Sequence, residues 1–178
     1  MFFKKKQISH KDIGGIIYEV IVRFGLFQQN NPMSYEAFVS EVLELDRRQL
    51  PEGYVLEIIF GVLFGAGIAI FEKCDPSVAK SIMDGIRGEL QKHANEIGYT
   101  KSRSEAVDIL FLKRAREYDN IFKDSNFVPS VLGKQFILNI TGRKNIDHSL
   151  LPVLEAATTI IWSNRNITEK ILREYKVK

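Results

Sequence analysis

The sequence predicts an all-α fold: a single-domain globular bundle of about seven or eight helices packed around a central apolar helix at about residues 54–73. The segment from Ile58 to Phe71 contains no charged residue and is the most apolar part of the chain. The other segments carry one apolar stripe each at helical spacing, and such stripes need a common apolar partner. With 178 residues, 45% of them hydrophobic, the chain can bury a substantial core. We therefore expect one domain over residues 1–178, with residues 1–8 as a flexible basic and aromatic N-terminal tail.

The first helix is expected to begin after Ser9, whose side chain can cap it. Glu19 and Arg23 are four residues apart on its outer face and can form an ion pair. Gly14 and Gly15 each cost on the order of 1 kcal/mol relative to alanine inside a helix, and a closely packed neighbour would offset that cost. The apolar residues at helical spacing are Ile13, Ile16, Ile17, Val20, Ile21, Phe24 and Phe27.

A second helix is expected at roughly residues 35–49, capped by Ser34, before the chain breaks at 51–53. The central helix follows. Its glycines at positions 61 and 65 are four residues apart and share one side of the helix. They predict a close-packed seam, which we expect to be formed by Gly61 and Gly65 against Gly14 and Gly15.

Glu57 is the one acid in an apolar setting. An acid suits the positive end of a helix, so we favour an exposed position for Glu57 in the first turn of the central helix over a buried one.

Two capping signals define the next helices. Asp75-Pro76 starts a helix that Gly98 ends. Ser102 and Glu105, three residues apart, form a capping box before a long apolar stripe that ends at Phe122.

The last third of the chain gives weaker patterns. Residues 136–141 are rich in β-branched side chains and fit either a helix or a strand, and we favour a helix because no partner strand is visible elsewhere. Asp147 is expected to cap a helix that ends near Trp162. A separate last helix is expected at about residues 168–176, starting at Thr168.

The nearest approach to a metal-ligand set is Glu89, His93 and Glu96, which share about one face of a predicted helix. A carboxylate-bridged metal in a helical bundle needs Glu-x-x-His pairs, and the chain contains none. His93 also lies along the apolar stripe of its helix. We therefore expect a histidine at the edge of the core, with no metal and no cofactor, and keep the three residues only as weak candidates.

The charge pattern argues against a nucleic-acid partner. The net charge is +3. The basic cluster of Lys113, Arg114 and Arg116 is interleaved with Glu117 and Asp119, which would repel a phosphate backbone.

The compartment is expected to be the cytoplasm. Cys74 is the single cysteine, which fits a reducing environment, and the basic start of the chain is not followed by the apolar core of a secretory signal. The uncharged stretch of the central helix spans about 21 Å, short of the roughly 30 Å hydrocarbon core of a bilayer, which argues against a membrane-spanning protein.

No catalytic, metal or nucleotide motif rises above chance, so the sequence leans against an enzyme without excluding one. We expect a non-enzymatic interaction or scaffold module that forms a homo-oligomer or binds a protein partner. An alternative is a binder of an apolar small molecule or lipid in a helix-lined core, because small residues at 61, 65, 66 and 67 can leave space. A further alternative is peripheral membrane association through the N-terminal tail.

Overall fold

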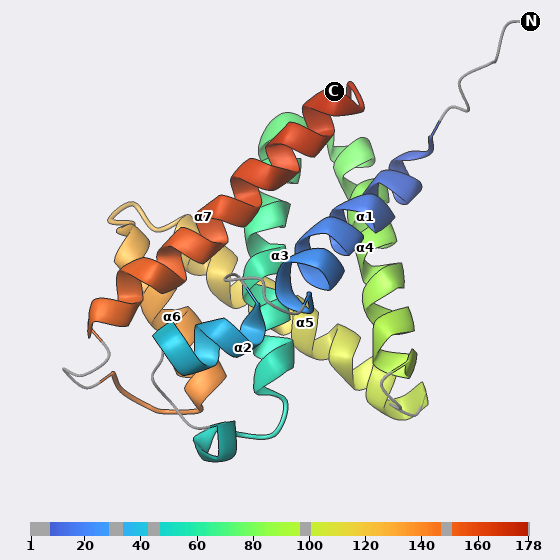
Figure 1. The fold of residues 1–178 in the computed structure, drawn as a ribbon. Helices are drawn as coiled ribbons and strands as arrows, with labels where there is room; N and C mark the ends of the chain where they lie inside the picture. The colour runs from blue at the N-terminus through green and yellow to red at the C-terminus, as the bar shows by residue number, and fades with distance from the viewer. Residues whose placement is uncertain (1–7, 29–33, 43–46, 97–100, 147–150, 178) are drawn as a thin grey trace, which may run out of the picture.

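Helix α3, Tyr54–Lys73, lies at the centre of the molecule, and the other helices pack around it (Figure 1). This computed structural model describes residues 8–28, 34–42, 47–96, 101–146 and 151–177. The described residues form seven α-helices and no strand. The prediction of an all-α bundle around a central apolar helix is therefore confirmed.

The elements follow one another in a simple order. Helix α1, His10–Tyr18, continues directly into a π-helical segment, η1, Glu19–Leu26. The short helix α2, Tyr35–Ala37, continues into a second π-helical segment, η2, Phe38–Val42, and η3, Arg47–Gln49, is a single 3₁₀ turn. After α3 come α4, Pro76–Glu96, α5, Lys101–Phe122, α6, Pro129–Thr141, and α7, Leu151–Glu174.

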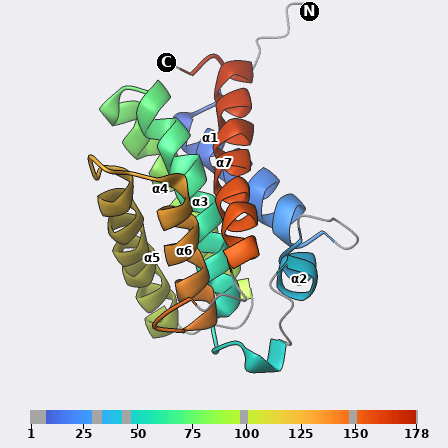
Figure 2. The ribbon, with the colours of Figure 1, turned by 90° about the vertical axis from the view of Figure 1, so that its left-hand side faces the viewer.

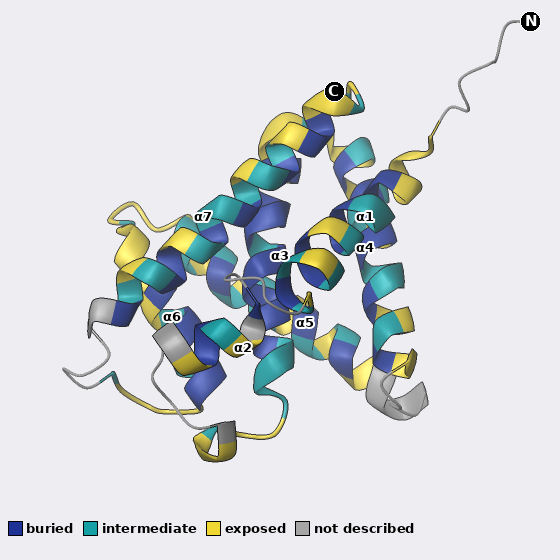
Figure 3. Cartoon of the chain, viewed as in Figure 1, coloured by how far each residue is buried: buried dark blue, intermediate teal, exposed yellow. Residues whose placement is uncertain are grey.

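Helix α3 is buried along most of its length (Figure 3). It is the one helix among the described residues that is long and apolar enough to cross a membrane, and 72% of its most apolar window is buried inside the fold. Its most extensive contacts are with α7, and it also packs against α6, α5, α4 and η1. Figure 2 shows α3 between α6 and α7 on the side where the three helices meet. Burial by other helices is the arrangement of a core helix, and it argues against a membrane-spanning role for α3.

The predicted helix starts at Ser9, Ser34 and Pro76 are confirmed. Ser9 Oγ accepts a hydrogen bond from the backbone N–H of Asp12 at 3.1 Å, and Asp12 Oδ2 accepts from the Ser9 backbone at 3.2 Å. Ser34 Oγ accepts from the backbone N–H of Ala37 at 3.2 Å. The predicted pair between Glu19 and Arg23 is also present, with 2.9 Å between Arg23 Nε and Glu19 Oε1.

The expected glycine seam has different partners from those predicted. A Cβ atom on Gly14 would lie 2.1 Å from the carbonyl oxygen of Ile82, and Gly14 faces Gly85, so α1 packs against α4 and not against α3 at this point. A Cβ on Gly65 would lie 2.2 Å from the carbonyl oxygen of Ile161 in α7. The two pairs of glycines therefore do not form one seam, because each close approach is made with another helix.

The remaining two glycines of the predicted seam differ from each other. A Cβ on Gly61 would lie 2.2 Å from Cε2 of Phe136 in α6. Gly15 has more room, since the nearest atom to its Cβ would be Cγ of Glu89 at 3.8 Å. Of these two glycines, only Gly14 therefore lies at a close contact between helix backbones, the one with α4.

Helix α7 replaces the two C-terminal helices that the sequence predicts. The sequence predicts a break between Trp162 and Thr168, but the structure has one continuous helix, Leu151–Glu174. Asn164 Nδ2 donates to the carbonyl oxygen of Ile160, and Thr168 Oγ1 donates to that of Asn164, each at 2.8 Å. These side chains satisfy their hydrogen bonds within the helix and do not interrupt it.

Three further expectations have mixed outcomes. Residues 136–141 are helical, within α6, and Gly142 ends that helix with a positive φ of 66°. Lys101 is already helical, so Ser102 lies inside the first turn of α5 and is not its cap. Most of the predicted N-terminal tail, Gly98, Asp147 and part of the predicted helix at 35–49 lie outside the described residues.

Candidate functional site

An apolar cavity of about 450 Å³ lies between α3 and α5, with one side chain of α4 at its wall. The uncharged residues that α3 contributes are Leu63, Phe64, Gly67, Ile68 and Phe71. The apolar residues from the other two helices are Met83, Phe111, Leu112, Ala115 and Phe122. Charged side chains are confined to four positions: Glu72, Arg116, Asp119 and Lys123.

The cavity exists because α3 has different surroundings on its two sides. Residues two positions apart in an α-helix point in nearly opposite directions, since each residue turns the helix by about 100°. The Gly65 side is closed by the backbone of α7 at Ile161. A Cβ on Gly67 would have no atom within 4 Å, so this side of α3 faces open space.

Aromatic packing holds the cavity walls in place from behind. The ring of Phe64 lies 5.2 Å from that of Tyr118, which is fully buried. The ring of Phe122 lies 5.2 Å from Phe127 and 6.2 Å from Trp162. Because these wall residues are fixed by neighbours outside the cavity, the space is preformed.

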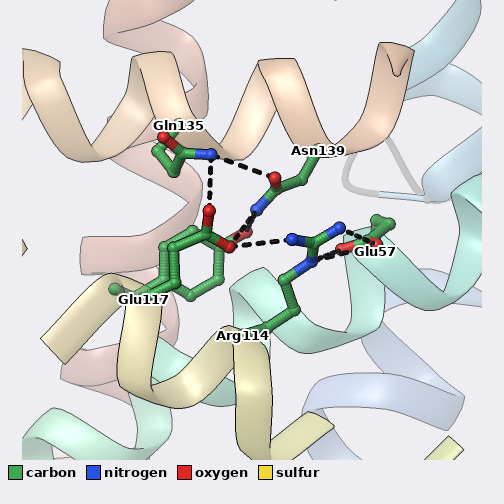
Figure 4. A network of polar contacts seen from close by, with 6 residues as sticks. Glu57, Arg114, Glu117, Gln135 and Asn139 are labelled. Carbon is green, nitrogen blue, oxygen red and sulfur yellow. Dashed lines mark hydrogen bonds and ion pairs between the residues drawn. The ribbon is translucent and has the colours of Figure 1, made fainter. Parts of the chain in front are cut away.

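A network of polar side chains ties α3 to α5 and α6; we call Glu57, Arg114, Glu117, Gln135 and Asn139 the polar clasp (Figure 4). Arg114 Nη2 donates to Glu57 Oε1 at 2.7 Å, and Arg114 Nε donates to Glu57 Oε2 at 2.8 Å. Arg114 Nη1 donates to Glu117 Oε2 at 2.9 Å. Gln135 Nε2 donates to Glu117 Oε1 at 3.0 Å, and Asn139 Nδ2 donates to Glu117 Oε2 at 3.3 Å.

The prediction that Glu57 is exposed is wrong. Glu57 lies in the first turn of α3, but only 8% of its surface is accessible. Burial is tolerated because Arg114, 57 residues further along the chain, supplies a two-pronged hydrogen-bonded ion pair. The pKa of Arg114 is raised, chiefly by its hydrogen bond to Glu57, so the guanidinium stays positively charged.

The polar clasp is a structural element and offers no reactive group. Each carboxylate oxygen of Glu57 and Glu117 already accepts at least one hydrogen bond from within the clasp. Tyr118, next to the clasp, accepts from Asn139 Nδ2 at 3.0 Å, and burial raises the pKa of its hydroxyl. A general acid or base needs a proton site that a substrate can reach, and these groups leave none free.

The three weak metal candidates lie on α4, but each is engaged elsewhere. His93 Nδ1 is hydrogen-bonded to the hydroxyl of Tyr18 at 2.8 Å. Glu96 Oε2 accepts from Arg23 Nη2 at 2.8 Å, and Glu89 pairs with Lys92. Within the part of the chain that the structure describes, no group of three or more His, Cys, Asp or Glu side chains could hold a metal ion.

His93 borders a second, smaller cavity of about 240 Å³, which Tyr18, Phe27, Tyr54 and Leu90 also line. The ring of Phe27 packs edge-on against that of His93 at 5.0 Å. Burial lowers the pKa of His93, and the charge of Arg23 lowers it further. The imidazole is therefore held in its neutral form at neutral pH.

Cys74 lies at the junction of α3 and α4, as its position between the two predicted helices suggests. The pKa of its thiol is raised, first by burial and then by the charge of Asp75. A raised thiol pKa lowers the thiolate fraction, so Cys74 is a poor nucleophile.

Comparisons with protein-family models, with curated proteins and with solved structures gave no match to this chain. Among the sites described above, the α3–α5 cavity has both the size and the lining of a ligand site. The sequence points to the small residues of α3 as a source of space, and Gly67 is the one of them at which space is present.

Proposed function

We propose that the protein binds a small apolar molecule, of the kind that an acyl chain represents, in the α3–α5 cavity. The observation that carries this proposal is the open space at Gly67 in a cavity with apolar and aromatic walls. Ligand pockets in proteins have volumes of roughly 300–1,000 Å³ and mostly apolar linings. The volume of about 450 Å³ falls in that range.

The composition of the cavity favours binding over catalysis. Its floor contains leucine, isoleucine and phenylalanine side chains, and its charged residues lie at four positions only. Two of the four, Asp119 and Lys123, pair with each other at 2.8 Å. Nucleophilic or acid–base chemistry needs a reactive side chain with an orienting partner beside the substrate, and the floor has no such pair. An apolar ligand would gain chiefly from leaving water.

The cavity can be filled from inside without touching its charged residues. The variant Gly67→Leu places a branched side chain in the open space, whereas Gly88→Leu does the same on α4, outside the cavity. Neither position has an atom within 4 Å of an added Cβ, so the two variants form a matched pair.

The test is a titration of the purified protein with an environment-sensitive naphthalene dye, followed by displacement of the dye with a saturated C12 alcohol. Native mass spectrometry of the same preparation detects any molecule that co-purifies. We expect saturable binding to the wild type and to Gly88→Leu, and binding at least about tenfold weaker to Gly67→Leu. Circular dichroism checks that both variants fold. The proposal is overturned if the wild type binds neither probe, or if Gly67→Leu binds both as well as the wild type does.

A protein-interaction role is a second proposal, and exposed apolar side chains favour it. Phe71 is 64% exposed and Ile109 is 69% exposed. We expect such a surface to support a homo-oligomer or a protein partner, which light scattering combined with chromatography tests directly. A monomer at all concentrations, with no partner captured, would contradict it.

Location and membrane contact stay predictions. The single cysteine, with no disulfide, favours the cytoplasm. Peripheral membrane contact through the basic and aromatic residues at the start of the chain is tested by sedimentation with anionic vesicles. No co-sedimentation would contradict that contact.

A further inference from the structure

The charged residues at the mouth of the α3–α5 cavity differ in whether they have an ion-pair partner. Glu72 pairs with Arg165 of α7, and Asp119 of α5 pairs with Lys123, which directly follows that helix. These two pairs account for three of the four charged residues that line the cavity. The fourth, Arg116, has no hydrogen bond or ion pair with any residue that the structure describes. Arg116 is therefore the one charged lining residue without an ion-pair partner in the described part of the chain.

Arg116 differs in this from arginines elsewhere in the fold. Arg87 holds Asp108 with two hydrogen bonds, of 2.8 and 2.6 Å, and Arg114 holds Glu57 in the polar clasp. Buried or half-buried acids of this protein thus recruit arginines as partners. Arg116 lies instead beside an apolar space, where no acid of the described chain reaches it.

The position of Arg116 on α5 places it at the edge of the apolar lining. Leu112 and Arg116 are four residues apart and therefore neighbours on one face of the helix. Leu112 is 38% exposed, so the apolar lining reaches the surface next to the guanidinium. A chain that enters the cavity would leave its outer end close to Arg116.

The guanidinium is suited to one class of end group. Its planar fork matches a carboxylate with two parallel hydrogen bonds, and such charge-assisted bonds are about twice as strong as neutral ones. The single positive charge of Arg116 matches a single negative charge. A doubly charged phosphate would bring a second negative charge to the same mouth, where the described lining offers no second unpaired cation.

From these observations we propose that the ligand of the α3–α5 cavity is a free, single-chain amphiphile with one carboxylate, held by its chain in the apolar cavity and by its head on Arg116. This inference rests on the proposed function, because it assigns the head group of a molecule whose chain the cavity binds. The ligand class is that of a fatty acid.

The test compares dodecanoate with dodecanol, which share a chain and differ in the charge of the head. Both are used below the concentration at which they aggregate, as competitors of the bound dye. We expect the wild type to bind dodecanoate at least about tenfold more tightly than dodecanol, a difference of about 1.4 kcal/mol.

Variants of α5 assign that preference to one side chain. Arg116→Gln is expected to remove the preference for dodecanoate and to leave the affinity for dodecanol unchanged. Arg116→Lys should retain part of it, because it keeps the charge without the planar fork. Lys113→Gln removes a positive charge from the same helix outside the cavity and should keep the full preference. Raising the salt concentration should weaken the preference of the wild type.

The outcomes separate the two proposals. If the wild type binds the acid and the alcohol equally, or if Arg116→Gln keeps the preference, the head-group assignment is overturned while chain binding stands. If neither compound binds, the proposed function fails, and this inference fails with it. If the protein ignores free dodecanoate but sediments with phosphatidylglycerol vesicles in an Arg116-dependent way, the site recognises a membrane surface and the free acid is the wrong ligand.

Discussion

The two sides of α3 use the same residue type for opposite purposes. On one side, Gly61 and Gly65 lie against Phe136 of α6 and the backbone of α7 at Ile161, with no room for a methyl group. On the other side, Gly67 faces a cavity of about 450 Å³. The side with Gly61 and Gly65 is packed against other helices, whereas the side with Gly67 borders the cavity.

The difference teaches that a glycine in an apolar helix has no fixed meaning. A missing side chain permits close helix packing where a neighbour moves into the space, and it leaves a void where none does. The neighbours of α3 are set by the crossing of α5, α6 and α7, which are distant in sequence. The closed side thus contributes to stability, whereas the open side leaves the space in which we propose that a ligand binds.

The largest effect on stability is expected from breaking the ion pair between Glu57 of α3 and Arg114 of α5. Arg114→Met leaves Glu57 buried without its partner, and removing one member of a buried ion pair costs roughly 3 kcal/mol. Because Leu112 and Ala115, on either side of Arg114, line the cavity, dye binding should weaken together with stability. Urea unfolding, followed by circular dichroism, measures the stability change.

The double variant Glu57→Met, Arg114→Met is the control for that prediction. Replacing both members of a buried pair by apolar side chains is often close to neutral. The double variant should therefore be more stable than Arg114→Met alone. If the changes in the free energy of unfolding from the two single substitutions simply add, the two residues are not coupled. The polar clasp then does not stabilise the packing of α5 against α3.

Replacing glycine by alanine should change the stability of the protein in opposite directions on the two sides of α3. In Gly65→Ala the new Cβ meets backbone, which cannot rotate away, so overpacking of about 1–3 kcal/mol exceeds the helix-propensity gain of about 1 kcal/mol. In Gly67→Ala the gain is unopposed, and stability should rise by up to about 1 kcal/mol. The urea midpoints of the two variants decide it, and shifts of the same sign would contradict the comparison.

The smallest expected effect is the contribution of His93, which lines the second cavity, to the pH dependence of stability. The fold lowers the pKa of His93. Below about pH 6.5, His93 therefore binds a proton more readily in the unfolded chain than in the folded protein. Stability from this group is fully present above that pH and is lost as the pH falls toward the folded-state pKa. The loss should stay under about 1 kcal/mol, because the half-exposed ring is screened by solvent.

His93→Gln isolates that contribution, since a glutamine oxygen can still accept from the hydroxyl of Tyr18. Urea unfolding near pH 7.5 and near pH 5 should show a smaller pH dependence for this variant than for the wild type. An equal dependence in both proteins would show that the effect does not come from His93.

The sequence predicts those parts of the fold that depend on local chemistry. The Ser9 cap, the start of α4 at Pro76 and the apolar length of α3 each follow from residues within a few positions of one another, and each is present. The break expected between Trp162 and Thr168 is wrong, because amide and hydroxyl side chains in this stretch form their hydrogen bonds within one continuous helix.

The candidate site depends on partners distant in sequence and is therefore harder to predict. Small residues in α3 suggest space, but only the placement of α7 and α5 shows that Gly65 is covered and Gly67 is not. The sequence predicts an exposed Glu57 because an acid suits the first turn of a helix, and it shows its actual partner, Arg114, only as one member of a mixed basic cluster. Arg116 belonged to the same cluster, and only the fold separates the two.

The packing of α3 against α7 has a consequence for how the chain is made. The contact of Gly65 with Ile161 joins residues separated by about 100 positions, and at 5–20 residues per second a ribosome needs roughly 5–20 s to add them. During that interval the most apolar helix of the protein exists without its main partner. The nascent chain would then expose the side of α3 that carries Gly61 and Gly65, so chaperone binding during synthesis should centre on this helix until α7 has emerged.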